Sequence, residues 1–172
     1  MSSAKQDPAI AIQITTDFRD VDVSLPRLKR LIATVCTRFG RYQGARTAYE
    51  ISLGIVDDIE ITRLNNQFLG RNVTTDCLSF DLSDDKTPQT GGNPRTLELI
   101  VNGQMAVREA DLRGHSAEAE LALYITHGLL HNFGFDDSTP SEARKIHDAE
   151  DRILQELGYG PVYNKDTDAQ EH

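Results

Sequence analysis

The segment from Ser116 to Phe133, SAEAELALYITHGLLHNF, most constrains what this chain can fold into. Its large apolar side chains recur every three or four residues, which predicts a helix that is apolar on most of its circumference. Such a helix has to be buried, so the rest of the chain must pack around it. The segment also carries His127 and His131, which lie four residues apart and therefore one turn apart on a helix.

The two imidazoles would point the same way and could converge on one ion at a Zn–N distance of about 2.1 Å. Gly134 can adopt a positive φ, so the chain can leave the helix and return with Asp137 as a third ligand. Asp136 is the competing carboxylate. Three ligands leave a fourth position open, which is typical of catalytic zinc. The pattern therefore predicts one Zn²⁺ at His127, His131 and Asp137, although iron, nickel or copper would also suit these donors.

Histidine pairs at this spacing also occur on half-buried helices without a metal, and it is the added glycine and aspartate that favour an ion. His115 and His147 lack the spacing and are predicted to be solvated. Cys36 and Cys77 are too few to suggest a disulfide framework, so a reducing compartment fits. The N-terminal sequence lacks an apolar secretion signal, and no apolar run approaches the roughly 20 residues that cross a bilayer. We therefore expect a cytoplasmic protein without membrane contact.

Strand and helix patterns alternate along the chain. Strands are predicted at 9–15, 51–57, 76–82 and 96–103, and helices from about Leu25, at 57–70, at 104–112, at 116–133 and from Thr139. The expected fold class is α+β, with one small mixed sheet of about four strands and helices packed around the central histidine-bearing helix. The 172 residues are expected to form a single domain over 1–163, followed by a flexible polar tail over 164–172. The turn-rich segment 83–95 is expected to be a loop.

The net charge of −9 argues against indiscriminate binding of nucleic acid, because phosphate binding depends on lysine and arginine contacts. The interval between Asp22 and Glu50 nevertheless contains no acidic residue and several basic ones. Two interpretations stay open at this point. The interval either presents a local basic face or is an amphipathic helix whose basic residues are merely solvated.

The segment HGLLHNFGFDD, at 127–137, resembles the signature of the YbeY-type endoribonucleases. The stretches DDIEITRLNNQFLGRNVTTDCLSFDL, AVREADLRGHSAEAELALYITHG and IHDAEDRILQELGY also resemble that family, so the similarity runs from about Ile51 to Tyr159. It implies a single-strand-specific, zinc-dependent endoribonuclease. It also implies a role in ribosomal RNA maturation, particularly at the 3′ end of the small-subunit RNA, and in ribosome quality control. The implied partners are ribosomal RNA and the small ribosomal subunit.

The chain departs from the family pattern at three places. Asp137 stands where the family has a third histidine, and its charge offsets part of the charge of an ion. Leu69 stands where the pattern has an arginine thought to contact RNA, and Arg71 is the nearest substitute. Glu98 and Leu99 replace a Gly-acidic pair. The predicted mechanism is metal-assisted phosphodiester hydrolysis, in which Arg71 neutralises charge on the phosphate.

Two alternatives remain. A zinc metalloprotease would need a glutamate after the first histidine as general base, and Gly128 occupies that place. The second alternative is a catalytically silent, ribosome-associated metal-binding protein. Asp76 could orient a histidine or simply form a turn. Gly128 itself costs a helix about 1 kcal/mol relative to alanine, and close helix packing is the favoured reason for its presence.

Overall fold

The computed structural model describes residues 9–42, 45–83, 94–160 and 162. Its main sheet has the strand order β1-β4-β6-β5, in which β1, β4 and β6 are parallel and the edge strand β5 is antiparallel to β6. This mixed sheet and its helices confirm the predicted α+β class. The strands are β1 (Ile10–Thr16), β2 (Arg41–Tyr42), β3 (Ala45–Arg46), β4 (Tyr49–Val56), β5 (Cys77–Asp81) and β6 (Arg95–Asn102). The helices are α1 (Leu25–Phe39), α2 (Asp58–Leu69), α3 (Gly103–Arg113), α4 (Ala117–Asn132) and α5 (Pro140–Glu156).

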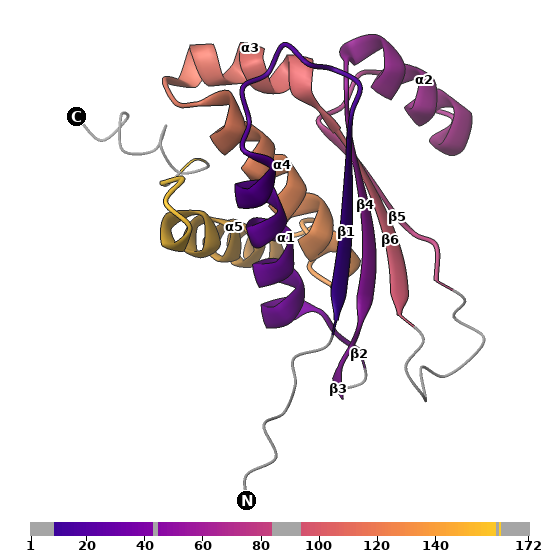
Figure 1. Ribbon diagram of the computed structural model, residues 1–172, viewed down its shortest axis with the longest axis vertical. Coiled ribbons are helices and arrows are strands. Elements are labelled where there is room, and N and C mark those ends of the chain that lie inside the picture. Colours follow the sequence, from indigo (N-terminus) through magenta and orange to yellow (C-terminus); the bar gives the residue numbers. More distant parts are fainter. Residues whose placement is uncertain (1–8, 43–44, 84–93, 161, 163–172) are drawn as a thin grey trace, which may run out of the picture.

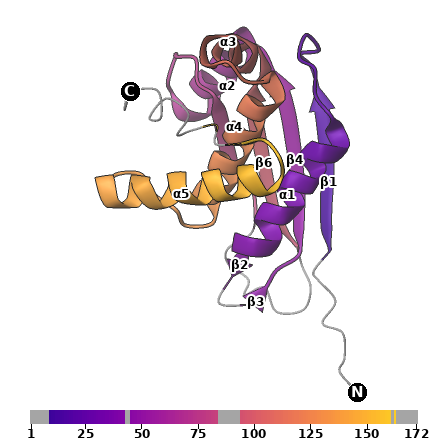
Figure 2. The ribbon, with the colours of Figure 1, turned by 90° about the vertical axis from the view of Figure 1, so that its left-hand side faces the viewer.

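The helices divide unequally between the two faces of the sheet. Figures 1 and 2 show α1, α4 and α5 on one face, with α3 joining the end of β6 to α4, while α2 lies at one end of the opposite face. The alternation of β4 explains this division, because Ile51, Leu53 and Ile55 are buried against the helices and Ser52 between them is exposed. A smaller apolar cluster around Ile61 packs α2 onto the other face.

Helix α4 is the centre of the larger core. It begins at the N-cap Ser116, whose side chain accepts a hydrogen bond from the backbone N–H of Ala119. Leu121, Ile125 and Leu129 are completely buried between the sheet, α1 and α5. The prediction of a buried central helix is therefore confirmed. Its position places the last two turns of α4, with both histidines, beside α5.

Close packing explains the glycine inside α4. A Cβ atom at Gly128 would lie 2.8 Å from both Cys77 Sγ and Leu99 Cδ2, and the Gly128 carbonyl accepts a hydrogen bond from Ser79 Oγ. A side chain there would push α4 away from β5 and β6. The structure thus supports the packing interpretation of this glycine.

We expect Gly128→Ala to lower the free energy of unfolding by about 1–2 kcal/mol, because the overlap exceeds the gain of about 1 kcal/mol in helix propensity. Urea denaturation of both proteins measures the difference. Gly54→Ala is the matched control, since a Cβ at Gly54 meets nothing within 4 Å. Equal losses in the two variants would contradict a packing role that is specific to Gly128.

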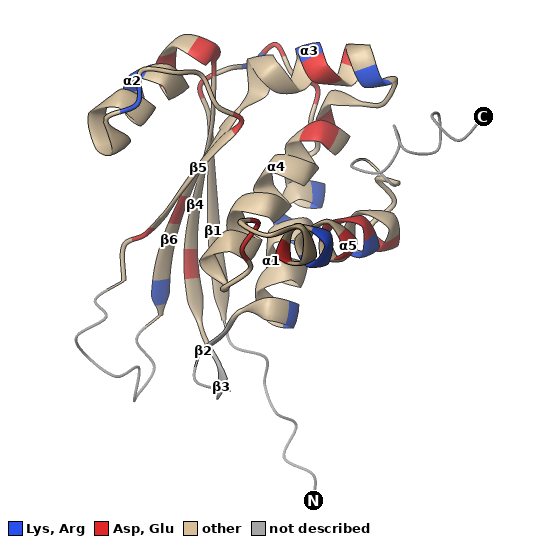
Figure 3. Ribbon diagram, turned by 180° about the vertical axis from the view of Figure 1, so that it is seen from behind, with Lys and Arg blue, Asp and Glu red and all other residues tan. Residues whose placement is uncertain are grey.

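The amphipathic interpretation of the basic interval fits the structure of α1. Leu28, Leu31, Ile32 and Val35 are buried, and two arginines of the helix face acidic partners on neighbouring helices. Arg27 Nη1 lies 2.9 Å from Glu118 Oε2 of α4, and Arg38 Nη2 lies 2.8 Å from Glu156 Oε2 of α5. Figure 3 shows basic positions on α1, acidic positions on α4 and both kinds on α5. Side chains at 41–46 lie outside the description, so the structure does not test the remainder of a basic face.

Some features of the chain were not predicted, and some predictions concern residues outside the described ranges. The short β2–β3 pair was not predicted. The polar tail at 164–172 and most of the expected loop, at 84–93, lie outside the described residues. The single-domain organisation stays a prediction. Among the helices described here, none is long and apolar enough to span a bilayer.

Candidate metal centre

Three donor atoms converge where α4 ends. His127 Nε2 and His131 Nε2 lie 2.8 Å apart, and Asp137 Oδ2 lies 3.9 Å from the first and 3.6 Å from the second. Gly134 has φ of 95°, a conformation that L side chains rarely adopt, and it turns the chain back so that Asp137 faces the helix. The reversal expected from the sequence is therefore present. Within the described ranges, these three residues form the one group of histidine, cysteine or acidic side chains close enough to share an ion.

The other ring nitrogen of each histidine is already engaged. His127 Nδ1 lies 2.6 Å from Glu150 Oε1, and His131 Nδ1 lies 3.1 Å from the backbone carbonyl oxygen of Phe135. A carboxylate oxygen and a carbonyl oxygen are both acceptors, so each Nδ1 is the donor. The lone pair of each neutral imidazole is then on Nε2, the atom that faces the shared point. Metal-binding histidines generally have this arrangement, so the donor set fits a divalent ion.

Glu150 of α5 is a buried carboxylate that contacts His127. Its side chain is 1% exposed and its second oxygen lies 3.3 Å from His147 Nδ1. The His147 ring stacks on the His127 ring, with centroids 6.4 Å apart and planes 16° apart. Burial lowers the pKa of His127, but the hydrogen bond and charge of Glu150 outweigh it and the net pKa is raised. The Glu150 carboxylate therefore restrains the His127 ring through Nδ1, the ring nitrogen that does not face the other two donor atoms.

Sequence reasoning missed Glu150, although a signal for it exists. Ile146, Ile153 and Leu154 form the buried stripe of α5, and Glu150 lies on that same stripe. A carboxylate among buried aliphatic side chains is costly unless it has a partner, so its position indicates a buried cation or hydrogen-bond donor. His127 is that donor.

Asp136, the competing carboxylate, has a different role. Its side chain accepts hydrogen bonds from the backbone N–H of Asp137 and from the hydroxyl of Ser138. These bonds, the one from Ser138 foremost, lower the pKa of the exposed Asp136 carboxyl. Asp136 thus holds the turn that presents Asp137.

The remaining histidine predictions need correction. His115 and His147 are outside the converging group, but neither is solvated as expected. The His115 side chain is 8% exposed and its Nε2 contacts Glu120, and the His147 side chain is 20% exposed against Glu150. The helix pattern could not show this because both partners come from packing between elements. Both cysteines are free, as expected, and burial raises the pKa of Cys36 to about 12.

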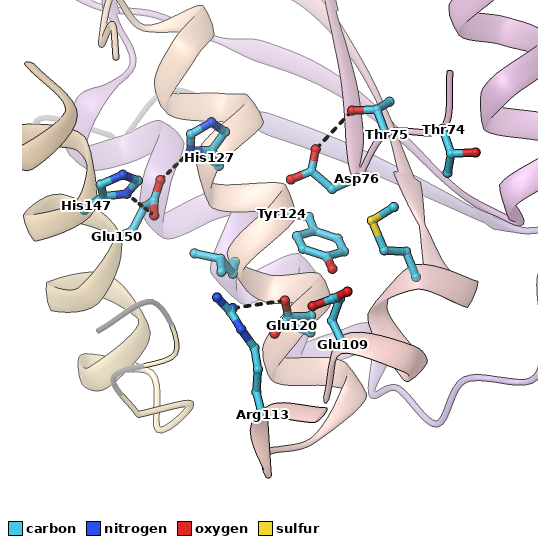
Figure 4. Close-up of a pocket in the computed structure, with 12 residues that line it drawn as sticks. Thr74, Thr75, Asp76, Glu109, Arg113, Glu120, Tyr124, His127, His147 and Glu150 are labelled. Atoms are coloured by element: carbon cyan, nitrogen blue, oxygen red, sulfur yellow. Dashed lines mark hydrogen bonds and ion pairs between the residues drawn. The ribbon is translucent and has the colours of Figure 1, made fainter. Parts of the chain in front are cut away.

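Arg71 and Asp76 lie on the segment between α2 and β5. Arg71 is exposed just after α2 and is not among the residues that line the cavity beside His127, so its catalytic role stays a prediction. Asp76 does line that cavity, and its charge contributes to the raised pKa of His127. Figure 4 shows the Asp76 carboxylate on the side of the cavity opposite His147.

An α+β fold with two histidines and a carboxylate at the end of a central helix defines a class, the α+β proteins with a candidate metal centre. Comparison with known proteins narrows this class. A family model described as "Endoribonuclease YbeY" matches residues 13–158. The chain belongs to the YbeY endoribonuclease family, as the resemblance in its sequence predicted.

Two relatives of this name match over nearly their whole length. The protein called endoribonuclease YbeY from Alkaliphilus metalliredigens is 30% identical, with 87% of this chain and 96% of the relative covered. The protein of the same name from Halalkalibacterium halodurans is 33% identical, with 86% and 98% covered. A solution structure of a Thermotoga maritima protein matches with a TM-score of 0.53 and 23% identity, covering 86% of this chain and 90% of that one. This last likeness supports the fold alone.

Proposed function

We propose that the protein is a zinc-dependent endoribonuclease that cuts single-stranded RNA. Its role is in maturation of ribosomal RNA, particularly at the 3′ end of the small-subunit RNA, and in ribosome quality control in the cytoplasm. The observation that carries the metal-dependent part is the convergence of His127 Nε2, His131 Nε2 and Asp137 Oδ2, with both Nδ1 atoms engaged elsewhere. The RNA-directed part rests on family membership.

The residues of the candidate site have different roles. His127, His131 and Asp137 would hold the ion, and Glu150 restrains His127 in the tautomer that can bind it. A divalent ion held there would supply Lewis-acid chemistry towards a phosphoryl oxygen or water. Arg71 supplies positive charge to the phosphate. Gly128, packed against Cys77, provides no general base where a metalloprotease has its glutamate, which disfavours peptide hydrolysis.

The test uses the purified protein with single-stranded ribosomal RNA and with casein, each with and without a chelator. The expected result is cleavage of RNA that stops with the chelator and returns with added Zn²⁺. Casein cleavage would replace the proposal with a protease, and inertness towards both substrates would leave a metal-binding protein without this activity. Elemental analysis after purification without added metal identifies the ion.

We expect Asp137→His to keep the ion and to lower the pH optimum of RNA cleavage by roughly one unit. A carboxylate offsets part of the charge of the ion, whereas a neutral imidazole does not, so the variant acidifies water more strongly and is active at lower pH. The pH profile of the cleavage rate measures this shift. Asp111→His, the same substitution at an exposed position of α3, is the matched control and should leave the optimum in place. An unchanged or raised optimum in Asp137→His would argue against Asp137 as a ligand.

A further inference from the structure

A cavity of about 430 Å³ adjoins the candidate metal centre. One wall is a face of α3, where Met105, Glu109 and Arg113 follow one another at four-residue intervals. The facing wall is α4, and the segment just before β5 closes the side (Figure 4). The volume lies within the range of about 300–1,000 Å³ that small-molecule sites occupy. The cavity is therefore large enough for a ligand.

The cavity is continuous with the metal centre through His127, which lines it and belongs to the converging trio. Along the same face of α4, Tyr124 and Glu120 follow at one and two turns from His127. Glu120 is thus about 10 Å from His127 along the helix axis. That length is the scale of one nucleotide, from its phosphate to the far edge of its base. A nucleotide whose phosphate lay at the ion could therefore place its base in the cavity.

The charges of the lining oppose a phosphate inside the cavity. Arg113 lines the cavity, and its Nη1 lies 3.3 Å from Glu120 Oε1. The negative charge of Glu120 therefore compensates the positive charge of Arg113. Asp76, Glu109 and Glu150 add three further carboxylates, and the Glu109 side chain makes no hydrogen bond to another residue in the part of the chain that the structure describes. Burial, followed by the charge of Glu120, raises the pKa of the Tyr124 phenol, so it stays protonated. The lining thus offers acceptors and apolar surface rather than a site for an anion.

We propose that this cavity binds the nucleobase next to the scissile phosphate and that it prefers guanine. The inference rests on the proposed ribonuclease function. Single-stranded RNA is commonly recognised through unpaired bases that contact apolar or aromatic side chains and hydrogen-bond along their Watson–Crick edge. Met105, Leu123 and Tyr124 provide the apolar contact, and Glu109 accepts the hydrogen bonds.

The preference for guanine follows from the arrangement of donors on each base. Guanine places N1–H beside its N2 amino group, so one carboxylate can accept from both. Uracil has its N3–H between two carbonyl oxygens, which a carboxylate repels. Adenine and cytosine have a ring acceptor beside the amino group. The same contact requires an unpaired base, because pairing occupies the Watson–Crick edge, which accounts for action on single strands.

The chain offers a direct reporter of the cavity. Met105 and Met1 are its two methionines, so ¹³C-methyl labelling of methionine gives one signal inside the cavity and one reference. The zinc-loaded protein is titrated with the 3′- and 5′-monophosphates of the four nucleosides. All carry the same phosphate, so differences between them report the base. The expected result is that guanosine monophosphate shifts the Met105 signal with the highest affinity.

Glu109→Gln is expected to weaken binding of guanosine monophosphate about tenfold, the scale of a lost bidentate base contact, and to leave the other three nearly unchanged. Asp111→Asn removes the same charge from an exposed position of α3 and should change each affinity less than twofold. Equal binding of the four nucleotides overturns the proposal. So does an unchanged guanosine affinity in Glu109→Gln.

Cleavage of an unstructured RNA of mixed sequence separates this proposal from the proposed function. Cuts that depend on the ion and fall next to all four bases alike would overturn the guanine site and leave the nuclease in place. Selective shifts of Met105 without cleavage of any RNA would overturn the nuclease and leave a guanine-binding cavity. Cuts concentrated beside guanine, and lost from that position in Glu109→Gln, support both.

Discussion

Replacing His131 with alanine is expected to abolish stoichiometric metal binding and to lower RNA cleavage more than about 100-fold. Removing a group that hydrogen-bonds to a metal ligand typically lowers metal affinity or activity about 10–100-fold. The loss in His131→Ala should be larger, because His131 itself contributes a donor atom to the ion. Its side chain is 34% exposed and its Nδ1 partner is a backbone carbonyl, so its removal leaves no buried charge. Metal content by elemental analysis and the cleavage rate of a single-stranded RNA are the measurements.

His131 is a sharper test than His127. Removing His127 would deprive the buried Glu150 of a partner, and an uncompensated buried charge typically costs about 3–5 kcal/mol. Loss of activity could then reflect unfolding. Asp111→Asn is the control for His131→Ala, since it changes an exposed polar side chain of α3 away from the three donors and should keep both the ion and the activity. Metal binding at wild-type stoichiometry in His131→Ala would refute the assignment of the centre.

The parts of the fold that follow from local pattern could be predicted. The four-residue spacing of Leu121, Ile125 and Leu129 fixes α4, and the N-cap Thr139 with Pro140 in the first turn fixes the start of α5. The four strands follow from the alternation of apolar residues. The pairing of β2 with β3 has no such signal, because each strand is two residues long.

Only the part of the candidate site that lies in one segment of the chain could be predicted from the sequence. The spacing from His127 to Asp137 and the glycine between them are local, and the geometry of the three donors agrees with the prediction. Glu150 and the cavity wall from α3 are not local, since they reach the site through helix packing. The environment of His115 was mispredicted for the same reason, because burial of a polar side chain depends on a partner that the helix pattern does not specify.

Glu150→Ala is expected to lower zinc affinity about 10–100-fold, the second-largest effect we predict. The Glu150 carboxylate accepts the hydrogen bond from His127 Nδ1, and without it the ring can rotate and exchange tautomers, so Nε2 is no longer held towards the shared point. Glu150→Gln should recover part of the affinity, because the amide oxygen can still accept that bond. Competition with a chromophoric chelator measures zinc affinity independently of catalysis.

Two measurements distinguish positioning of His127 from a general structural role of Glu150. Thermal unfolding of the metal-free variants reports any loss of stability, and affinity is compared at a temperature where each variant is folded. Glu156→Ala, on the same helix but at the surface beside Arg38, is the matched control and should bind zinc as tightly as the unaltered protein. If Glu150→Ala and Glu156→Ala bound zinc equally well, Glu150 would serve the core alone, and His127 would be oriented by the packing of α4.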